Sequence, residues 1–107
     1  MKNFRLENFT RGWLIGDFEP NVIKTGQFEF SVKKYEIGDE EARHYHAVAQ
    51  EISVIVNGKF EMNDKILEEG DITLLEPGKE AKFKCLEAGY TAVIKIPSVK
   101  DDKFIIN

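Results

Sequence analysis

Three residues whose side chains can bind metal ions lie close together near the middle of the chain. The only two histidines, His44 and His46, are two residues apart, and Glu51 follows five residues later. Residues two apart on an extended strand point the same way, so the two imidazoles would project together. Two imidazoles and one carboxylate form a set that suits Fe, Mn, Ni or Zn as a divalent ion and leaves coordination positions open. We therefore take these three residues as candidate metal ligands.

The metal hypothesis requires the backbone to bend between His46 and Glu51. The offset of five between His46 and Glu51 is odd, so one continuous strand would turn the carboxylate away from the imidazoles. The chain must therefore bend or change strand across residues 47–50. That tetrapeptide contains no Gly, Pro or Asn, so the sequence gives no local signal for the bend.

The chain as a whole has the pattern of a β protein. Short runs of β-branched and aromatic residues alternate with turn signals at roughly ten-residue spacing, which is typical of an all-β sandwich or barrel. The segment before residue 27 is irregular, and we assign no element to it. The expected strands are Gln27–Tyr35, Arg43–His46, Glu51–Val56, Lys59–Met62, Lys65–Leu67, Asp71–Leu75, Ala81–Leu86 and Tyr90–Ile96.

The Asn57-Gly58 dipeptide gives the strongest hairpin signal, because a type I′ turn needs positive φ at both central residues. A two-residue loop there would pair Ile55 with Phe60, and Ser53 with Met62. Opposed residues share one face of a sheet. We therefore expect these four side chains to lie on the same face as the candidate carboxylate ligand.

The other face of the same strand is apolar as well, because it carries Ile52, Val54 and Val56. A strand that is apolar on both sides is usually covered on both. The cover is either the N-terminal segment of residues 1–26, where Trp13 would pack on the outer face or in a dimer contact, or a second copy of the chain. We therefore expect a homodimer.

The residues around the histidines follow a spacing that resembles a known family. Five residues separate Gly38 from His44, one separates the histidines, four separate His46 from Glu51, and six separate Glu51 from Gly58. This spacing resembles the first conserved motif of the cupin superfamily. The resemblance implies a small jelly-roll β-barrel, with the metal held inside it by the two histidines and the acid.

A second stretch resembles the second cupin motif in a degraded form. It runs from Gly70 through Glu76-Pro77-Gly78 to Ala81, and alanine stands where the family has its fourth, histidine ligand. Alanine has no donor atom, so either water completes the coordination or the site holds no ion. Glu80 should turn away by alternation, and Cys85 should face inward about 13 Å along the strand, too far to share the ion.

The two motifs and their connection span residues 38–85 of a single domain of residues 1–107, and they imply a pocket beside the metal. We expect that the ligand is a sugar or a small carboxylate. Three other functions stay open: a non-catalytic binding module without metal, a metal-dependent dioxygenase, and a cupin-type isomerase or epimerase that uses His44 or His46 as its base. The expected pocket-lining residues are Ser53, Ile55, Phe60, Met62, Ala81 and Phe83.

Whether the site is catalytic is left open, because no free side chain stands out as a general base. The acids outside the first motif fall in predicted loops or in the tail, where solvation explains them. They include Glu40-Glu41, Glu68-Glu69 and Asp101-Asp102.

Composition excludes several other classes of protein. The 107 residues carry a formal net charge of -4, so a nucleic-acid partner, which needs clustered Lys and Arg, is not expected. The apolar runs are too short for a membrane span or a signal peptide, and we expect a cytoplasmic protein that does not bind membranes. The single cysteine, Cys85, excludes an internal disulfide and is expected to be a small buried residue.

Overall fold

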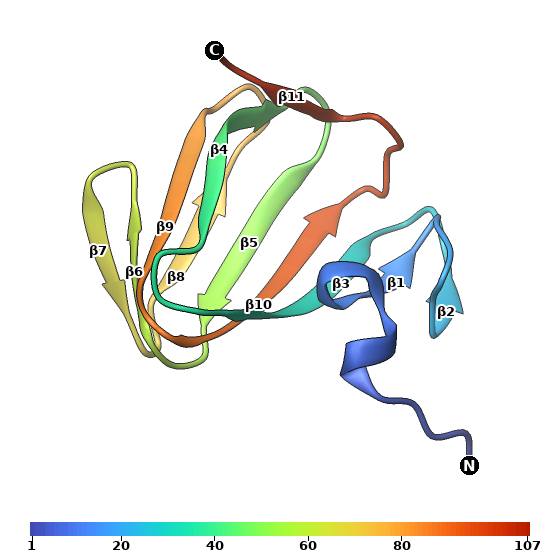
Figure 1. Cartoon of the computed structure of the whole chain (residues 1–107). Helices are drawn as coiled ribbons and strands as arrows, with labels where there is room; N and C mark the ends of the chain where they lie inside the picture. Colours follow the sequence, from blue (N-terminus) through green and yellow to red (C-terminus); the bar gives the residue numbers. More distant parts are fainter.

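The computed structural model describes all 107 residues and consists of two β-sheets that face each other (Figure 1). Its only helical elements are two short 3-10 turns, η1 (Leu6–Asn8) and η2 (Thr10–Gly12). No helix has the length and apolar character that crossing a bilayer requires. The all-β prediction is confirmed.

Eleven strands build the two sheets. The six-stranded sheet has the order β2-β1-β3-β10-β5-β8, and the five-stranded sheet has the order β11-β4-β9-β6-β7. From β3 onward the chain changes sheet at every connection except the one between β6 and β7. The bounds are β1 Trp13–Gly16, β2 Ile23–Lys24, β3 Glu29–Tyr35, β4 Glu40–His46, β5 Gln50–Ile55, β6 Lys59–Met62, β7 Lys65–Glu68, β8 Ile72–Leu75, β9 Ala81–Glu87, β10 Gly89–Ile96 and β11 Lys103–Ile105.

All eight expected strands are present, and three further strands were not expected. β1 and β2 lie in the N-terminal segment and extend the six-stranded sheet beyond β3, while β11 pairs with β4 at the edge of the other sheet. These three strands have two to four residues each, and β1 also carries a register shift. Such short segments show too few alternations for a periodic pattern to be recognised.

The predicted Asn57-Gly58 hairpin is wrong. β5 and β6 belong to different sheets, and of the two turn residues only Gly58 has a positive φ, at 87°. A Cβ on Gly58 would lie 2.8 Å from the Cα of Gly89, so this glycine permits close approach between two turns rather than a type I′ hairpin. The hairpin lies instead at Asn63 and Asp64, which have φ values of 50° and 66° and join β6 to β7.

The strand pairing predicted from this hairpin is wrong as well. Ile55 pairs with Thr91, and Ser53 pairs with Val93 and Thr73, whereas Phe60 and Met62 pair within the five-stranded sheet. The side chains of Ile55 and Phe60 still meet, because the two sheets face each other across the barrel. Their shared environment therefore comes from packing between sheets and not from a ladder within one.

One end of the barrel interior is filled by an apolar cluster. Phe60 and Phe83 stack with ring centroids 5.0 Å apart, and Tyr35 packs against the edge of Phe60 at 5.5 Å. Cys85 is fully buried in the same cluster, which confirms the prediction made for it. The full set is Tyr35, Ile55, Phe60, Leu67, Phe83 and Cys85.

Candidate metal centre

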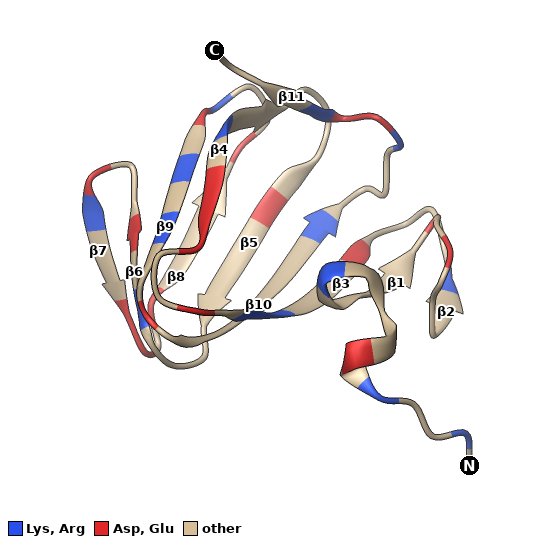
Figure 2. Ribbon diagram, viewed as in Figure 1, with Lys and Arg blue, Asp and Glu red and all other residues tan.

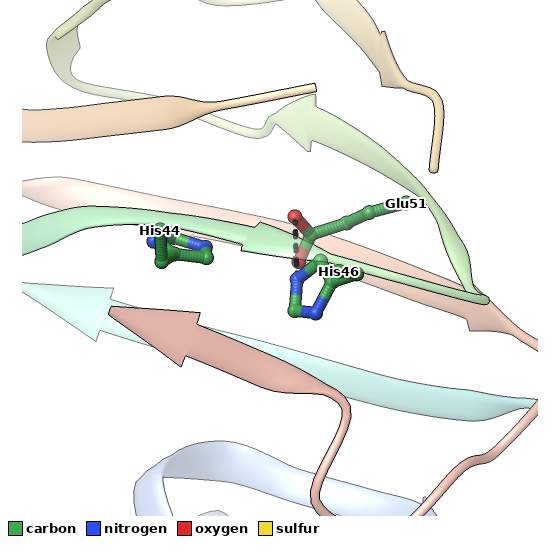
Figure 3. Close-up of side chains that lie close together, drawn as sticks. All are labelled: His44, His46 and Glu51. Carbon is green, nitrogen blue, oxygen red and sulfur yellow. Dashed lines mark ion pairs between the residues drawn. The ribbon is translucent and has the colours of Figure 1, made fainter. Parts of the chain in front are cut away.

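The three candidate ligands meet at the other end of the interior. His44 and His46 lie on β4, and Glu51 lies on β5 in the opposite sheet (Figure 3). One donor atom from each residue falls within 4.8 Å of the others, and His46 Nε2 lies 3.7 Å from Glu51 Oε2. Both histidines are buried, at 5% and 3% exposure, while Tyr45 between them points away and stacks on Phe104. Alternation along β4 therefore brings the two imidazoles to one side.

The backbone bend that the metal hypothesis requires is present. β4 ends at His46 and β5 begins at Gln50 in the other sheet. The carboxylate of Asp102 holds this bend, because it accepts hydrogen bonds from the backbone N–H groups of residues 47–49 at 2.9 to 3.3 Å. Asp102 is only 6% exposed, so the expectation that it is a solvated tail residue is wrong.

Backbone carbonyls orient both imidazoles. His44 Nδ1 lies 2.8 Å from the carbonyl of Ala42, and His46 Nδ1 lies 3.3 Å from the carbonyl of Asp102. A ring N–H that donates to a carbonyl fixes the tautomer, so the lone pair sits on Nε2.

The environment of His46 provides a test of whether a metal fits. Its Nε2 is buried and has no hydrogen-bond partner, which is costly for a polar atom inside a protein. A divalent cation between this nitrogen, His44 and Glu51 would satisfy it. Two imidazole nitrogens and a carboxylate oxygen are donors that Fe, Mn, Ni and Zn accept, so the residues fit a divalent metal.

The protonation states of His44 and Glu51 also favour metal binding. Burial lowers the pKa of the His44 imidazole, which keeps it neutral at physiological pH. Burial raises the pKa of the Glu51 carboxyl, but His46, Lys95 and Lys33 outweigh this and leave that pKa below its usual range. A neutral imidazole and an ionised carboxylate are the forms that bind metals.

Ala81 adds no donor to this group. It pairs with His44 across β4 and β9 and is 1% exposed. Glu80 points outward and lies 3.7 Å from Arg43, while Cys85 belongs to the apolar core. Of the residues considered, only His44, His46 and Glu51 therefore offer a donor atom to this site.

A small cavity of about 20 Å³ lies between the ligands and the apolar core. Of the expected pocket-lining residues, Ser53, Met62, Ala81 and Phe83 border this space together with His44. Ile55 and Phe60 lie deeper, in the core cluster. A volume of this size holds about one water molecule, so a larger ligand needs another space.

That larger space is a cavity of about 580 Å³ on the outer side of the ligands, and the sequence did not predict it. Glu41 lies in its wall, 3.6 Å from Lys33 and 3.8 Å from Lys103, and accepts a hydrogen bond from the Tyr35 hydroxyl. The expectation that Glu41 is solvated is therefore wrong. A register shift between Glu41 and His44 turns both side chains inward, although their spacing is odd.

The N-terminal segment contributes an aromatic wall to the same cavity. The ring of Trp13 on β1 has the Lys33 and Lys95 ammonium groups 4.7 and 5.0 Å from its centroid. Phe18 packs edge-on to it at 6.4 Å, and Lys95 also pairs with Glu29 at 3.4 Å. Trp13 thus lies in the wall of the candidate site and not on the outer sheet face, which was one of the two places expected for it; the other, a dimer contact, stays a prediction.

Sequence comparison finds no relative: no protein-family model matches the chain, and no curated protein sequence matches it. Comparison of structures does find proteins with a similar fold. A conserved protein with a double-stranded β-helix domain from Klebsiella pneumoniae has a TM-score of 0.73 at 18% identity, and the match covers 100% of this chain and 98% of that one.

Two further solved structures are similar at lower coverage. A protein containing a cupin-2 domain from Shewanella frigidimarina matches with a TM-score of 0.56 at 23% identity, over 68% of this chain and 72% of that one. Oxalate decarboxylase from Bacillus subtilis matches with a TM-score of 0.67 at 13% identity, over 76% of this chain and 24% of that one. At these identities the likeness concerns the fold, and the chain has the double-stranded β-helix fold of the cupin superfamily.

Proposed function

We propose that this protein binds one divalent metal ion through His44, His46 and Glu51, and a small polar ligand, a sugar or a carboxylate, in the cavity beside it. The observation that carries the proposal is the orientation of the imidazoles. Each Nδ1 meets a backbone carbonyl, and this leaves both Nε2 lone pairs free; that of His46 lies 3.7 Å from Glu51 Oε2, and one nitrogen of His44 lies within 4.8 Å of both. Manganese centres in the oxalate decarboxylase of Bacillus subtilis support the use of this fold for metal binding.

Two groups of residues would have separate roles, one in binding the metal and the other in binding the small ligand. The two histidines and Glu51 would hold the ion, which when bound would act as a Lewis acid on an oxygen of the ligand. Lys33, Lys95 and the face of Trp13 would contact the ligand itself, since all three line the larger cavity. Ammonium groups suit a carboxylate or hydroxyl oxygens, and an indole ring suits the apolar face of a sugar.

A metal-dependent enzyme, of the dioxygenase or isomerase type, is the second candidate. It is favoured by the Lys33–Glu41 pair, which places two titratable groups in the wall of the cavity. Burial lowers the pKa of the Lys33 ammonium, which brings this group closer to the range in which it can exchange protons.

The metal part of the proposal is tested with protein prepared without a polyhistidine tag. After treatment with a chelator, titration with Mn, Fe, Ni and Zn salts in a calorimeter should show one ion per chain. His46→Ala should weaken binding by at least about 100-fold, because it removes a ligand, while circular dichroism stays unchanged. Tyr45→Phe is the matched control, since this residue points to the other side of β4. Wild-type protein that binds none of these ions would contradict the proposal.

The ligand part is tested separately with a panel of simple sugars and small mono- and dicarboxylates. Thermal stability of the metal-loaded protein should rise with one of these compounds and rise less with the metal-free protein. Trp13→Ala should weaken the affinity for that compound about tenfold without changing the affinity for the metal. The reason is that the indole lines the cavity but is not one of the three candidate metal-binding residues. Loss of metal binding in Trp13→Ala would contradict this division of roles.

A further inference from the structure

Three side chains border both of the large cavities of the protein. One is the cavity of about 580 Å³ beside the candidate metal ligands, which we call the charged cavity, and the other is a groove of about 740 Å³ between the N-terminal segment and β3. Figure 2 shows charged residues on η2, β3, β10 and the segment that leads into β11, all of which contribute to the wall of the charged cavity. The three shared side chains are Arg11 in η2, Lys33 on β3 and Glu41 on β4.

The Lys33 ammonium is held inside the barrel by contacts on two sides. Its Nζ lies 3.6 Å from Glu41 Oε1 in the opposite sheet and 4.7 Å from the centre of the Trp13 ring. The Lys33 side chain is only 14% exposed. Burial lowers the pKa of this ammonium, and the positive charges of Lys103 and Arg11 add to the lowering against the opposing attraction of Glu41. The neutral, nucleophilic amine is therefore reached more easily here than at an exposed lysine.

Glu41 is placed to take a proton from this ammonium. Its Oε2 accepts a hydrogen bond from the Tyr35 hydroxyl at 3.3 Å, and the Lys103 ammonium lies 3.8 Å from its Oε1. Burial raises the pKa of the Glu41 carboxyl, but Lys33 and Lys103 outweigh this and leave that pKa lowered. Once Lys33 has given up its proton, the larger of these two attractions is gone, so the carboxyl holds a proton more readily.

Arg11 is the one Lys or Arg in the wall of the charged cavity without an acidic partner. Its backbone is left-handed, with φ of 49°, and it precedes Gly12, where a Cβ would overlap the carbonyl oxygen of Val32. The close approach of this turn to β3 therefore fixes where the guanidinium begins. An unpaired guanidinium suits a carboxylate, to which it can donate two parallel hydrogen bonds. The other cations of the wall each pair with a carboxylate and are Lys33, Lys95, Lys100 and Lys103.

We propose that Lys33 forms a covalent imine with the carbonyl carbon of a small 2-oxo acid whose carboxylate binds Arg11. A 2-oxo acid offers one electrophilic carbon for the amine and one carboxylate for the guanidinium. The inference deepens the proposed function by naming the class of carboxylate ligand, and it rests on that function only for the use of the charged cavity as the ligand site. It does not require the metal ion, because neither Lys33 nor Arg11 belongs to the candidate ligand group.

The reaction begins with the transfer of one proton from Lys33 Nζ to Glu41. The neutral nitrogen then attacks the carbonyl carbon, a C–N bond forms, and the electron pair of the C=O π bond moves to the oxygen. A second proton passes from the nitrogen to that oxygen. Glu41 returns its proton to the resulting hydroxyl group, the C–O bond breaks, and water leaves as the nitrogen lone pair forms the C=N bond. One ammonium and one carbonyl thus give one iminium ion and one water, and the Trp13 ring suits either cation.

The first experiment traps the imine by reduction in metal-free protein. The protein is incubated with glyoxylate and reduced with cyanoborohydride, which delivers a hydride to the iminium carbon and leaves a stable secondary amine. Mass spectrometry of the whole protein should show one fast addition, and peptide fragmentation should place it on Lys33. The addition should be at least about tenfold faster there than at Lys34, whose side chain is 62% exposed.

Two variants show whether the fast addition needs the Lys33 amine. Lys33→Arg keeps the positive charge but cannot form an imine, so it should lose the fast addition with unchanged circular dichroism. Lys34→Arg is the matched control on the same strand, and it should keep the fast addition because this side chain is exposed. The peptide map of the wild-type protein needs no variant, so it decides the site even where Lys33→Arg does not fold.

The role of Arg11 is tested by comparing glyoxylate with acetaldehyde, which has a methyl group in place of the carboxylate. Arg11→Gln should raise the glyoxylate concentration for half-maximal trapping about tenfold and should leave trapping of acetaldehyde within about twofold of wild type. Arg5→Gln is the matched control and should change neither value. Arg5 lies in the same N-terminal segment but pairs with the exposed Glu7 at 3.1 Å.

Two results would overturn the proposal. The first is trapping that proceeds at equal rates on Lys33 and Lys34, and the second is an Arg11→Gln variant that changes both compounds alike or neither. These failures are distinct from failure of the proposed function. Sugars or simple carboxylates that bind without a trapped adduct would leave the proposed function in place, and trapping on Lys33 in a protein that binds no metal would leave the imine in place.

Discussion

The two ends of the barrel interior are built by the same strands and differ completely in chemistry. β3 gives Tyr35 to the apolar core and Lys33 to the charged cavity, and β5 gives Ile55 to the core and Glu51 to the metal centre. Along each strand the inward positions change from apolar to charged within two to four residues. The apolar packing that stabilises the fold and the charged groups that could bind a ligand therefore lie at different ends of the interior, and a substitution within the apolar core should leave the metal centre unchanged.

The largest expected effect is on the apolar end. Phe60→Ala removes a ring that is fully buried between Tyr35 and Phe83, and it should lower the free energy of unfolding by about 3–5 kcal/mol. Urea denaturation measures this loss. Metal stoichiometry of the folded fraction should stay at the wild-type value, because the ring lies outside the ligand group.

Phe104→Ala serves as the control for that measurement. Phe104 also stacks on an aromatic ring, that of Tyr45, but it is 42% exposed on the outside of the barrel. Its loss should cost about 1 kcal/mol or less. Equal losses for the two variants would contradict the assignment of the folding free energy to the closed end.

The second largest effect is expected for Asp102, the residue of the C-terminal segment that contacts the loop beside the metal centre. Asp102→Ala leaves the N–H groups of residues 47–49 without their acceptor and frees the loop that joins His46 at the end of β4 to β5, which carries Glu51. We expect a loss of about 2 kcal/mol in stability and of about 10- to 100-fold in metal affinity, measured by denaturation and calorimetry.

Two variants sharpen this prediction for the C-terminal segment. Asp102→Asn keeps one acceptor oxygen and should fall between wild type and alanine. Asp101→Asn is the control, since Asp101 is exposed and asparagine tolerates its positive φ of 57°. Wild-type metal affinity in Asp102→Ala would show that the bend does not depend on this carboxylate.

A third, smaller effect is expected between the two ends. Ser31 and Thr91 are almost fully buried, and their hydroxyl groups have no hydrogen-bond partner. Thr91→Val replaces an unsatisfied hydroxyl by a methyl group of similar shape and should stabilise the protein by about 1 kcal/mol. Thermal denaturation measures this, and Thr73→Val on β8, which is only partly buried, is the comparison. A destabilised Thr91→Val would mean that its hydroxyl has a partner in solution.

The contrast between the ends also explains what the sequence could predict. Alternation alone placed His44 and His46 on one side and Cys85 inside, because period-two patterns survive wherever a strand is regular. The motif spacing indicated that Glu51 joins the histidines. Local pattern could not show how, since the acceptor that bends the chain, Asp102, is more than fifty residues away in sequence.

The predicted positions of two other side chains, Glu41 in solvent and Trp13 on the outer sheet face, were wrong because their strands are irregular. The register shift after Glu41 turns that residue inward against simple parity, so an acid of the cavity was assigned to solvent. Trp13 lies on a strand of four residues that has its own register shift. The charged cavity is therefore the part of the site that the sequence did not predict, because a register shift and a short strand place two of its residues, Glu41 and Trp13.

The smallest expected effect comes from pH, and it concerns one imidazole at the charged end. Burial lowers the pKa of His44 below its ordinary value of 6.5, so the folded state favours the neutral ring. The stability gained this way is fully present above pH 6.5 and is lost as pH falls below it toward the lowered value. Glu41 and Glu51, whose pKa values lie below their ordinary 4.5, add losses only at more acid pH. Between pH 6.5 and pH 4.5, the thermal stability of the metal-free wild-type protein should therefore decline as pH falls, and that of His44→Gln should not. A decline of equal size in both proteins would assign it to another group, whereas its absence from His44→Gln would show that this ring is kept neutral and free to bind a cation.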